Sequence, residues 1–543
     1  MTNNVMITIN AKMRGVFYKM GIAKVITAAE AAALIEDGAT IASAPFALAG
    51  WPEEVALAIE KRFLETGHPR DLTHVHAAGV GNRLERGESA WTAHEGLIKR
   101  LILSHTDFQQ KTMDLIEQNK VEAYNLPLGV ILQLYNEIAR RGPGLLTKVG
   151  MGTFIDPRFD GGKLNTKAQE DLVELVNFAG EEWLFYKKFP VNVTIIRGTS
   201  ADEKGNITFE KEGVSLEWLP VAQAAKACGG ITIVQVERIV KSGTMHPKLV
   251  KVPGIYVDYI VVASKPEYQQ QTAKTFFNAA FAGDIKVPTG SIPPIPLDGE
   301  KVMCRRSAME LKPGAIALGI GIPQAIANVL SEEKADHLIT PISESGSIGG
   351  IPGVGGDFGH HFNAEASVDQ HAHFNYYDGG GLETAFIGLG ECDIEGNINA
   401  SKFNGKVYGV GGFINVTQNA KKVIFTGNFT AGKLKVKVED GKLVIEQEGK
   451  FRKFLNKIVQ TTFSGKYANE VGQTVMFITD RAVLELTPAG LVLTEIAPGI
   501  DLEKDVLAQM EFKPIISPNL KLMPAEIFQP TWGKLKQIIE TNN

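Results

Sequence analysis

Apolar and polar positions near the start of the chain predict a helix, a buried strand and a second helix, in that order. Residues 27–30, Thr-Ala-Ala-Glu, have the capping-box pattern of a helix N-terminus, and we expect this Ala-rich helix to run to Asp37. Gly38 then stops it. Residues 39–43 form a short run typical of a buried strand, and Pro52 opens the next helix. The positions of that helix expected to face the core are Val55, Ile59 and Phe63.

The same order of elements recurs about half a chain later. Residues 308–311 lead into Pro313-Gly314, residues 315–318 have the pattern of a strand, and Pro323 opens a helix. We interpret the recurrence as duplication of one α/β domain. Further β-branched runs, typical of strands buried on both faces, stand at residues 193–196, 231–234 and 260–262. Each half is therefore predicted to contain an open, mostly parallel sheet flanked by helices.

A Pro-rich stretch separates the two halves. With 543 residues, the chain exceeds the ~250–300 residues at which a single hydrophobic core stops growing. The prolines of residues 286–296 remove backbone donors and disfavour helix and central strand. We therefore predict an N-terminal domain over residues 1–285, a linker over 286–300 and a C-terminal domain over 301–543.

Charge, hydropathy and cysteine content argue against several classes of function. The 56 basic and 61 acidic residues are mixed along the chain, so the net charge of −5 leaves no basic stripe for a nucleic acid. We see no run of ~18 apolar residues and no cleavable leader, and we expect a cytoplasmic protein without a membrane partner. The three cysteines, Cys228, Cys304 and Cys392, are far apart, which argues against a disulfide framework or a cysteine zinc site.

The most informative stretch, residues 343–350, places Glu344 among glycines and small hydroxyl residues directly after a short strand-like run. Glycines let the main chain approach a ligand and present N–H groups to an anion. A carboxylate held in such a place can act as a covalent catalyst, so Glu344 is a candidate nucleophile. The alternative is an acidic turn in which Glu344 caps a helix and the glycines only form the bend.

A second glycine loop, Gly409-Val410-Gly411-Gly412, is a candidate donor of backbone N–H groups to an oxyanion. It lacks the Gly-Lys-Ser/Thr end of a phosphate-binding P-loop. A tight turn before a strand is the alternative interpretation of this loop.

Several motifs accompany Glu344 in a fixed order. They are Tyr377-Asp378-Gly379-Gly380-Gly381-Leu382, the run Gly-Asn-Ile-Asn-Ala-Ser-Lys-Phe at 396–403, the loop 409–413, and the stretches 246–254, 310–314 and 318–323. With these motifs the chain resembles the family I coenzyme A transferases, from Thr27 to about Ile527. The resemblance is strongest to the single-chain acetate/propionate CoA-transferases, in which two subunit types are fused.

The resemblance implies an active site between the two halves, with Glu344 as the catalytic residue and residues 409–412 as the oxyanion and CoA-binding loop. It also implies coenzyme A as a substrate, with no permanently bound cofactor and no metal. The implied partners are acyl-CoA and a carboxylic acid, and the implied assembly is a homodimer or homotetramer. Candidate contacts of CoA or the substrate are Asn399, Phe46 and Leu128.

Two positions depart from the family pattern. Leu128 stands where relatives usually carry a glutamine, so its side chain cannot donate the amide hydrogen bond made there. Ala44-Pro45-Phe46 replaces a Gly-Gly-Phe-like turn, which makes the loop stiffer. We expect the acyl pocket to differ in shape from that of relatives that use acetate or propionate.

Other residues near the motifs have less specific interpretations. The histidines suggest a metal site, but without a helical H-E-x-x-H we interpret them as loop or core residues: His360, His361, His371 and His373. The aromatic residues that either line a pocket or fill the core are Phe374, Tyr376 and Tyr377. The cations that are either solvated or in contact with the anionic CoA are Arg305, Arg306, Lys402 and Lys406. Asp378 and Glu383 receive no chemical role.

The predicted function is an acyl-CoA:carboxylate CoA-transferase for short-chain acyl groups such as acetate or propionate. It would act by ping-pong chemistry through a glutamyl-CoA thioester at Glu344. An acyl-CoA hydrolase on the same scaffold is the first alternative, and a non-catalytic small-molecule-binding module is the second.

Overall fold

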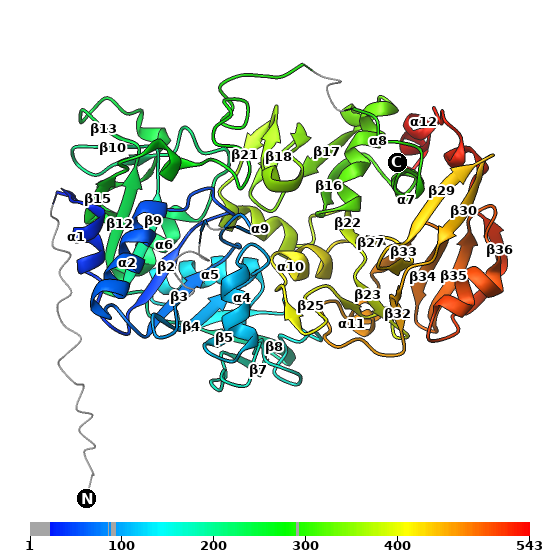
Figure 1. Ribbon diagram of the computed structural model, residues 1–543, viewed down its shortest axis with the longest axis horizontal. Helices are drawn as coiled ribbons and strands as arrows, with labels where there is room; N and C mark the ends of the chain where they lie inside the picture. Colours follow the sequence, from blue (N-terminus) through cyan, green and yellow to red (C-terminus); the bar gives the residue numbers. More distant parts are fainter. Residues whose placement is uncertain (1–21, 85, 88–93, 289–292, 543) are drawn as a thin grey trace, which may run out of the picture.

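The protein consists of two α/β halves that lie side by side along its longest axis (Figure 1). The computed structural model describes residues 22–84, 86–87, 94–288 and 293–542. The first half runs from blue to green in Figure 1, and the second from light green to red. In the described part of the chain, no helix combines the length and the apolar character needed to cross a bilayer.

An eight-stranded sheet, parallel throughout, forms the core of the first half. Its strands, in order across the sheet, are β1 (Lys24–Val25), β15 (Tyr259–Val262), β12 (Ile231–Val236), β9 (Val193–Arg197), β2 (Thr40–Ser43), β3 (Leu72–His76), β4 (Ile98–Leu103) and β5 (Glu122–Asn125). Every residue of β2 and β9 is buried, as expected for strands covered on both faces. Helices on this sheet include α1 (Ala28–Ala33), α2 (Glu53–Thr66), α5 (Leu128–Ala139) and α6 (Trp218–Ala227).

The second half is built on a ten-stranded mixed sheet. Its strands, in order, are β21 (Ala366–Ser367), β18 (Ser347–Ile348), β17 (Ile339–Ile342), β16 (Gly314–Leu318), β22 (Thr384–Gly388), β27 (Lys422–Thr426), β33 (Thr474–Ile478), β34 (Ala482–Thr487), β35 (Gly490–Ile496) and β36 (Ile515–Leu522). The five strands from β17 to β33 are parallel. Helices of this half include α7 (Gly299–Ala308), α8 (Ile326–Glu332), α9 (Gln370–Asp378) and α10 (Phe413–Gln418).

The two sheets share one strand order, which agrees with a duplicated unit. In the first half the order β3-β2-β9-β12-β15 is parallel throughout, and β17-β16-β22-β27-β33 repeats it in the second. In each half a helix precedes the second strand of that order, α1 before β2 and α7 before β16, and another helix follows it. The fold class is therefore the predicted one: two related, mostly parallel α/β units in tandem.

One boundary of a helix differs from the sequence expectation. The capping box at Thr27 and Glu30 is present, but α1 ends at Ala33 rather than Asp37. There the guanidinium of Arg62 donates to the carbonyl oxygens of Ala32 and Ile35 at 2.8 and 2.9 Å, which takes up acceptors that a longer helix would use. Within the predicted linker, helix α7 already begins at Gly299, and residues 289–292 lie outside the described residues. The domain boundaries remain predictions.

Asn125, at the end of β5, ties the two halves together. Its Nδ2 donates to the carbonyl oxygens of Leu103 and Ser104 at 2.9 and 2.6 Å, while its Oδ1 accepts the N–H of Val410 at 3.1 Å. The Gly411 N–H donates to the Ser104 carbonyl oxygen at 2.8 Å. One amide side chain in the first half therefore holds the glycine loop of the second.

Helix α5 continues this contact at its N-terminus. The N–H of Leu128 donates to the Gly411 carbonyl oxygen at 3.0 Å, and the N–H of Gly129 donates to Oδ1 of Asn415 at 3.1 Å. Helix N-termini have N–H groups without partners inside the helix, so these acceptors from the other half satisfy them. A side chain at Gly129 would lie within 2.5 Å of Asn415 and Phe374, which explains the glycine at this close approach.

Replacing Asn125 with alanine should loosen this junction. The Val410 N–H would lose its acceptor in a buried place, and two carbonyl oxygens would each lose one donor, which costs about 2–3 kcal/mol. We expect the thermal midpoint of Asn125→Ala to fall by several degrees in calorimetry. Asn136→Ala is the control, because that amide bonds only Gln133 on its own helix and should change the midpoint little. An equal effect of both variants would contradict the junction.

Candidate active site

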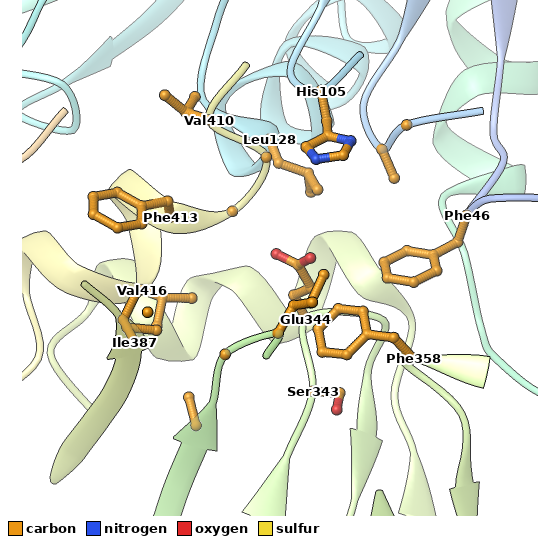
Figure 2. Close-up of a pocket in the computed structure, with 18 of the residues that line it drawn as sticks. Phe46, His105, Leu128, Ser343, Glu344, Phe358, Ile387, Val410, Phe413 and Val416 are labelled. Atoms are coloured by element: carbon orange, nitrogen blue, oxygen red, sulfur yellow. The ribbon is translucent and has the colours of Figure 1, made fainter. Parts of the chain in front are cut away.

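A cavity of about 270 Å³ lies between the two halves. The loops that line it follow strands β2, β3 and β4 in the first half and β16, β17 and β22 in the second. Ligand sites of open parallel sheets form at the carboxyl ends of the strands, so both sheets contribute their usual binding edge to one cavity. Figure 2 shows His105 and Leu128 on one side of this space and Glu344 and Phe358 on the other.

Glu344 is placed by a tightly bonded loop after β17. The N–H of Ser343 donates to the Ser347 carbonyl oxygen at 3.0 Å, and the hydroxyl of Ser347 donates to the Gly359 carbonyl oxygen at 3.0 Å. Gly346 has φ of 92°, and a Cβ there would overlap the carbonyl oxygen of Val368. The hydroxyls and glycines of this stretch therefore build the turn, and the carboxylate is the group that it presents to the cavity.

His361 stabilises the same loop through both nitrogens of its ring. Its Nδ1 lies 2.7 Å from the Gly349 carbonyl oxygen, and its Nε2 lies 2.7 Å from Oγ of Ser343. Burial lowers the pKa of His361 to about 4, so the ring is neutral. With Nδ1–H donating to Gly349, Nε2 accepts the hydroxyl proton of Ser343.

Burial raises the pKa of the Glu344 carboxyl to about 7. The residue is partly buried, and it lines the cavity. The backbone N–H of Gly412 opposes this rise, because its hydrogen bond favours the ionised form. A Cβ at Gly412 would overlap Oε2 of Glu344, so only glycine lets the backbone come this close. The result is a carboxylate that is more basic than usual yet still has one donor.

The four residues of the glycine loop have different surroundings. The N–H groups of Val410 and Gly411 are bonded to Asn125 and Ser104 in the first half, whereas Gly412 faces Glu344. The loop precedes helix α10 rather than a strand. All four residues, Gly409 to Gly412, line the cavity. The donor nearest the carboxylate is therefore Gly412, and the middle of the loop joins the halves.

Of the three other candidate contacts, two line the cavity and one does not. Phe46 and Leu128 line the cavity, and both are buried. Asn399 is not among the lining residues, because its Nδ2 donates to Oε2 of Glu391 at 2.7 Å and to the Lys402 carbonyl oxygen at 2.6 Å. Asn399 thus shapes the turn before the hairpin of β25 (Lys402–Phe403) and β26 (Lys406–Val407).

Among the cavity residues that the sequence did not indicate are three with ring side chains: His105, Phe108 and Phe358. The Phe358 ring stacks on that of Phe46 with centroids 6.1 Å apart and planes at 29°, so one aromatic residue from each half borders the site. His105 comes two residues after the apolar strand β4. The rule that ligands gather at strand ends, applied to this strand, would have indicated it.

The remaining candidates are mostly structural. His373 Nε2 lies 3.0 Å from the hydroxyl of Tyr377, whose ring lines the cavity, and Phe374 is fully buried. In the described residues no group of histidine, cysteine and acidic side chains is arranged to hold a metal ion. Burial raises the pKa of Asp378 to about 7, and its Oδ1 accepts from Asn415 at 2.8 Å.

Arg305 and Arg306 correct the sequence interpretation, because both are buried inside the second half. The Nε of Arg306 donates to Glu495 at 2.8 Å and its Nη1 to Glu310 at 2.7 Å. Arg305 donates to the carbonyl oxygen of Gln529 at 2.6 Å. Neither is a solvated surface charge, and neither lines the cavity.

Comparison with known proteins decides the family. The chain is 48% identical over 524 residues to the caffeate CoA-transferase of Acetobacterium woodii, a match that covers 95% of this chain and 100% of that protein. It is 42% identical over 512 residues to the acetate CoA-transferase YdiF of Escherichia coli (strain K12), covering 94% and 96%. The family model described as Coenzyme A transferase matches residues 25–263. The chain belongs to the coenzyme A transferase family.

The fold of this CoA transferase agrees with that of a solved relative. The structure of the acyl-CoA transferase YdiF from E. coli O157:H7, described as a thioester complex with CoA, superimposes with a TM-score of 0.88 at 39% identity. The match covers 94% of this chain and 97% of the other. The family predicted from the sequence motifs is confirmed.

The raised pKa of Glu344 in this CoA transferase predicts a pH-dependent stability difference. The folded protein keeps this proton up to pH about 7, whereas an unfolded glutamate loses it near 4.5, so the group's contribution to stability is lost as pH rises between these values. Glu344→Gln has no such loss. We expect its thermal midpoint to exceed that of the wild type by a few degrees at pH 8, and by much less at pH 5.

Calorimetry at both pH values checks this difference. Glu383→Gln is the control, since Glu383 pairs with Lys421 at the surface and its replacement should act similarly at both pH values. An advantage of Glu344→Gln that is the same at pH 5 and pH 8 would show that the carboxyl is not perturbed.

Proposed function

We propose that the protein is an acyl-CoA:carboxylate CoA-transferase in which Glu344 carries CoA as a glutamyl thioester. The observation that carries this proposal is a carboxylate with a raised pKa, held against Gly412 in a cavity between two α/β halves. The thioester complex with CoA described for the solved relative supports the same chemistry.

The proposed reaction has two matched half-reactions. An oxygen of the Glu344 carboxylate attacks the thioester carbonyl carbon, the C–S bond breaks, and CoA thiolate and a mixed anhydride form. The thiolate then attacks the glutamyl carbonyl of the anhydride, which releases the donor acid as its carboxylate and leaves glutamyl-CoA. An acceptor carboxylate reverses these steps. Because each step exchanges one acyl bond for another, the free energy of the thioester is conserved.

The surroundings of Glu344 suit this sequence. Burial makes the carboxylate a better nucleophile than a solvated one, because its pKa is raised. The Gly412 N–H is in place to stabilise negative charge that develops on the glutamyl oxygens. The walls are largely apolar, with Phe46, Phe358 and Leu128 among them, and an apolar cavity limits hydrolysis of the anhydride and thioester.

Mass spectrometry tests the covalent step. We expect a CoA adduct on the peptide that contains Glu344 after the protein is mixed with propionyl-CoA or acetyl-CoA without acceptor. Added carboxylic acid should discharge it. Glu344→Ala should form no adduct and lose transfer activity by at least a thousandfold, because the nucleophile is gone.

The other outcomes separate the alternatives. Steady release of CoA without an adduct and without dependence on an acceptor would identify an acyl-CoA hydrolase. Binding of CoA with neither adduct nor release, across a panel of acyl groups, would favour a non-catalytic binding module. Unchanged transfer by Glu344→Ala would refute the role of Glu344.

The lining of the cavity favours an acid with a single carboxylate. Among the described residues, no lysine or arginine lines it. A second carboxylate on the acyl chain would therefore be buried without a cationic partner, which costs several kcal/mol. The relatives named for acetate and for caffeate are named for monocarboxylic acids. We propose short-chain monocarboxylic acids such as acetate and propionate as substrates, with longer or planar apolar acids packing against the rings of Phe46 and Phe358 that line the cavity.

Butyrate and succinate provide a matched test of this preference, since both have four carbons and only succinate has a second carboxylate. With acetyl-CoA as donor, we expect kcat/KM for butyrate to exceed that for succinate by about 100-fold or more, equivalent to roughly 3 kcal/mol. Steady-state assays of acceptor dependence measure both values. Equal values would show that a cation outside the described lining reaches the acid.

Contacts outside the cavity and the assembly remain proposals. The hairpin of β25 and β26 carries Lys402 and Lys406 and stands beside Ala400 and Gly409 of the cavity wall, so we propose that these lysines meet the phosphates of CoA. We also propose a cytoplasmic homodimer or homotetramer, as the family resemblance implies.

A further inference from the structure

We propose that His105 is the side chain that hydrogen-bonds the acyl carbonyl oxygen opposite Glu344, and that it stabilises the oxyanion formed when Glu344 attacks the thioester. The inference rests on the proposed function and adds a catalytic residue on the wall contributed by the first half. Figure 2 shows the imidazole at the cavity, facing the Glu344 carboxylate across the open space.

The backbone around His105 is fixed against the glycine loop. His105 and Gly409 form an antiparallel bridge, the Thr106 N–H donates to the Tyr408 carbonyl oxygen at 2.8 Å, and the Thr106 hydroxyl donates to the Val407 carbonyl oxygen at 2.6 Å. Together with the bond between Ser104 and Gly411, these contacts set the register between the segment 104–106 and the loop. The same loop presents Gly412 to Glu344. His105 is therefore positioned relative to the nucleophile although it belongs to the other half.

The ring also has a defined orientation. A Cβ at Gly79 would lie 2.7 Å from Nδ1 of His105, so glycine leaves room for this edge of the ring. The Phe108 ring packs beside it, with centroids 5.3 Å apart and planes at 51°. With Nδ1 on the Gly79 side, Nε2 is the nitrogen available to a ligand in the cavity.

Other side chains that line the cavity are poorly suited to this role. On the wall from the first half, Phe46, Phe108 and Leu128 carry no donor. From the second half, the hydroxyl of Ser343 is engaged by His361 and that of Tyr377 by His373. In the glycine loop, the N–H groups of Val410 and Gly411 are bonded to the first half. Since position 128 is a leucine, His105 is the side-chain donor on its wall.

The charge state of His105 suits a hydrogen-bond donor rather than a proton-transfer group. Burial lowers its pKa to about 4, so the ring is neutral near pH 7 and carries one N–H and one lone pair. A neutral imidazole donates to an oxyanion without forming an ion pair with the Glu344 carboxylate, which must stay free to attack. The carbonyl oxygen gains negative charge only during the reaction, so the hydrogen bond strengthens in the transition state.

Substitution of His105 tests the assignment. Loss of one oxyanion donor typically lowers kcat by 10²–10³-fold. We expect His105→Leu to lower kcat by about 100-fold or more, with KM for acyl-CoA changed less than fivefold. His105→Gln, which retains an N–H donor, should recover at least tenfold of that loss. His94→Leu is the control for loss of a histidine and should retain kcat within about fivefold, because His94 does not line the cavity and its Nε2 lies 2.6 Å from Oε1 of Glu60.

A second measurement separates this inference from the proposed function. Rapid-quench mass spectrometry measures the rate at which the glutamyl-CoA adduct forms. In His105→Leu this rate should fall in parallel with kcat, while the thermal midpoint of that variant stays close to the midpoint of His105→Gln. Equal losses in both His105 variants, or a change in KM alone, would overturn the donor role and leave the Glu344 chemistry intact. Absence of the adduct in the wild type would instead overturn the proposed function.

Discussion

The hydrogen bonds between residues 104–106 and the loop 407–411 determine the geometry of the site, because they join the two halves where the cavity lies. Asn125 reinforces them by bonding both partners of this ladder at once. Glu344 belongs to the second half and His105 to the first, and their relative position is set by how these backbone segments register. A shift of this ladder by one residue would move His105 relative to Glu344, because Glu344 and Gly412 both belong to the second half.

Two opposing effects determine the pKa of the Glu344 carboxyl. Desolvation raises its pKa and makes it basic, while the Gly412 N–H favours the ionised form. A fully solvated glutamate would be ionised but weakly nucleophilic, and a buried one without a donor would stay protonated near neutral pH. The close backbone approach at a glycine provides the donor without the bulk and mobility of a polar side chain.

Much of the fold was predictable because its signals are local. The capping box at Thr27 and the β-branched runs that became β9, β12 and β15 depend on neighbouring residues in the chain. The end of α1 was not predictable, since Arg62, from the next helix, takes carbonyl groups near its C-terminus.

The site shows the same contrast between local and distant signals. The motif around Glu344 indicated a candidate nucleophile, and Phe46 and Leu128, predicted as contacts of CoA or the substrate, line the cavity. Asn399 belongs to another of the motifs, at residues 396–403, yet its amide forms hydrogen bonds with Glu391 and Lys402 around its own turn. His105 is an isolated histidine in the sequence, and only pairing across the halves brings it opposite Glu344. Likewise, the burial of Arg306 depends on Glu495, 189 positions away.

The two halves contribute different walls of the cavity. The proposed covalent step and the choice of acid therefore depend on different residues. The second half supplies Glu344, the nucleophile that we propose, and the Gly412 donor, whereas Phe46, Phe108 and Leu128 of the first half line the cavity in which we propose that the acyl chain binds. The side chains of these three residues make none of the hydrogen bonds that hold the Glu344 loop. Within one family, such an arrangement lets the acid that is accepted diverge quickly while the covalent chemistry stays the same, and it makes the first half the natural place to redesign substrate range.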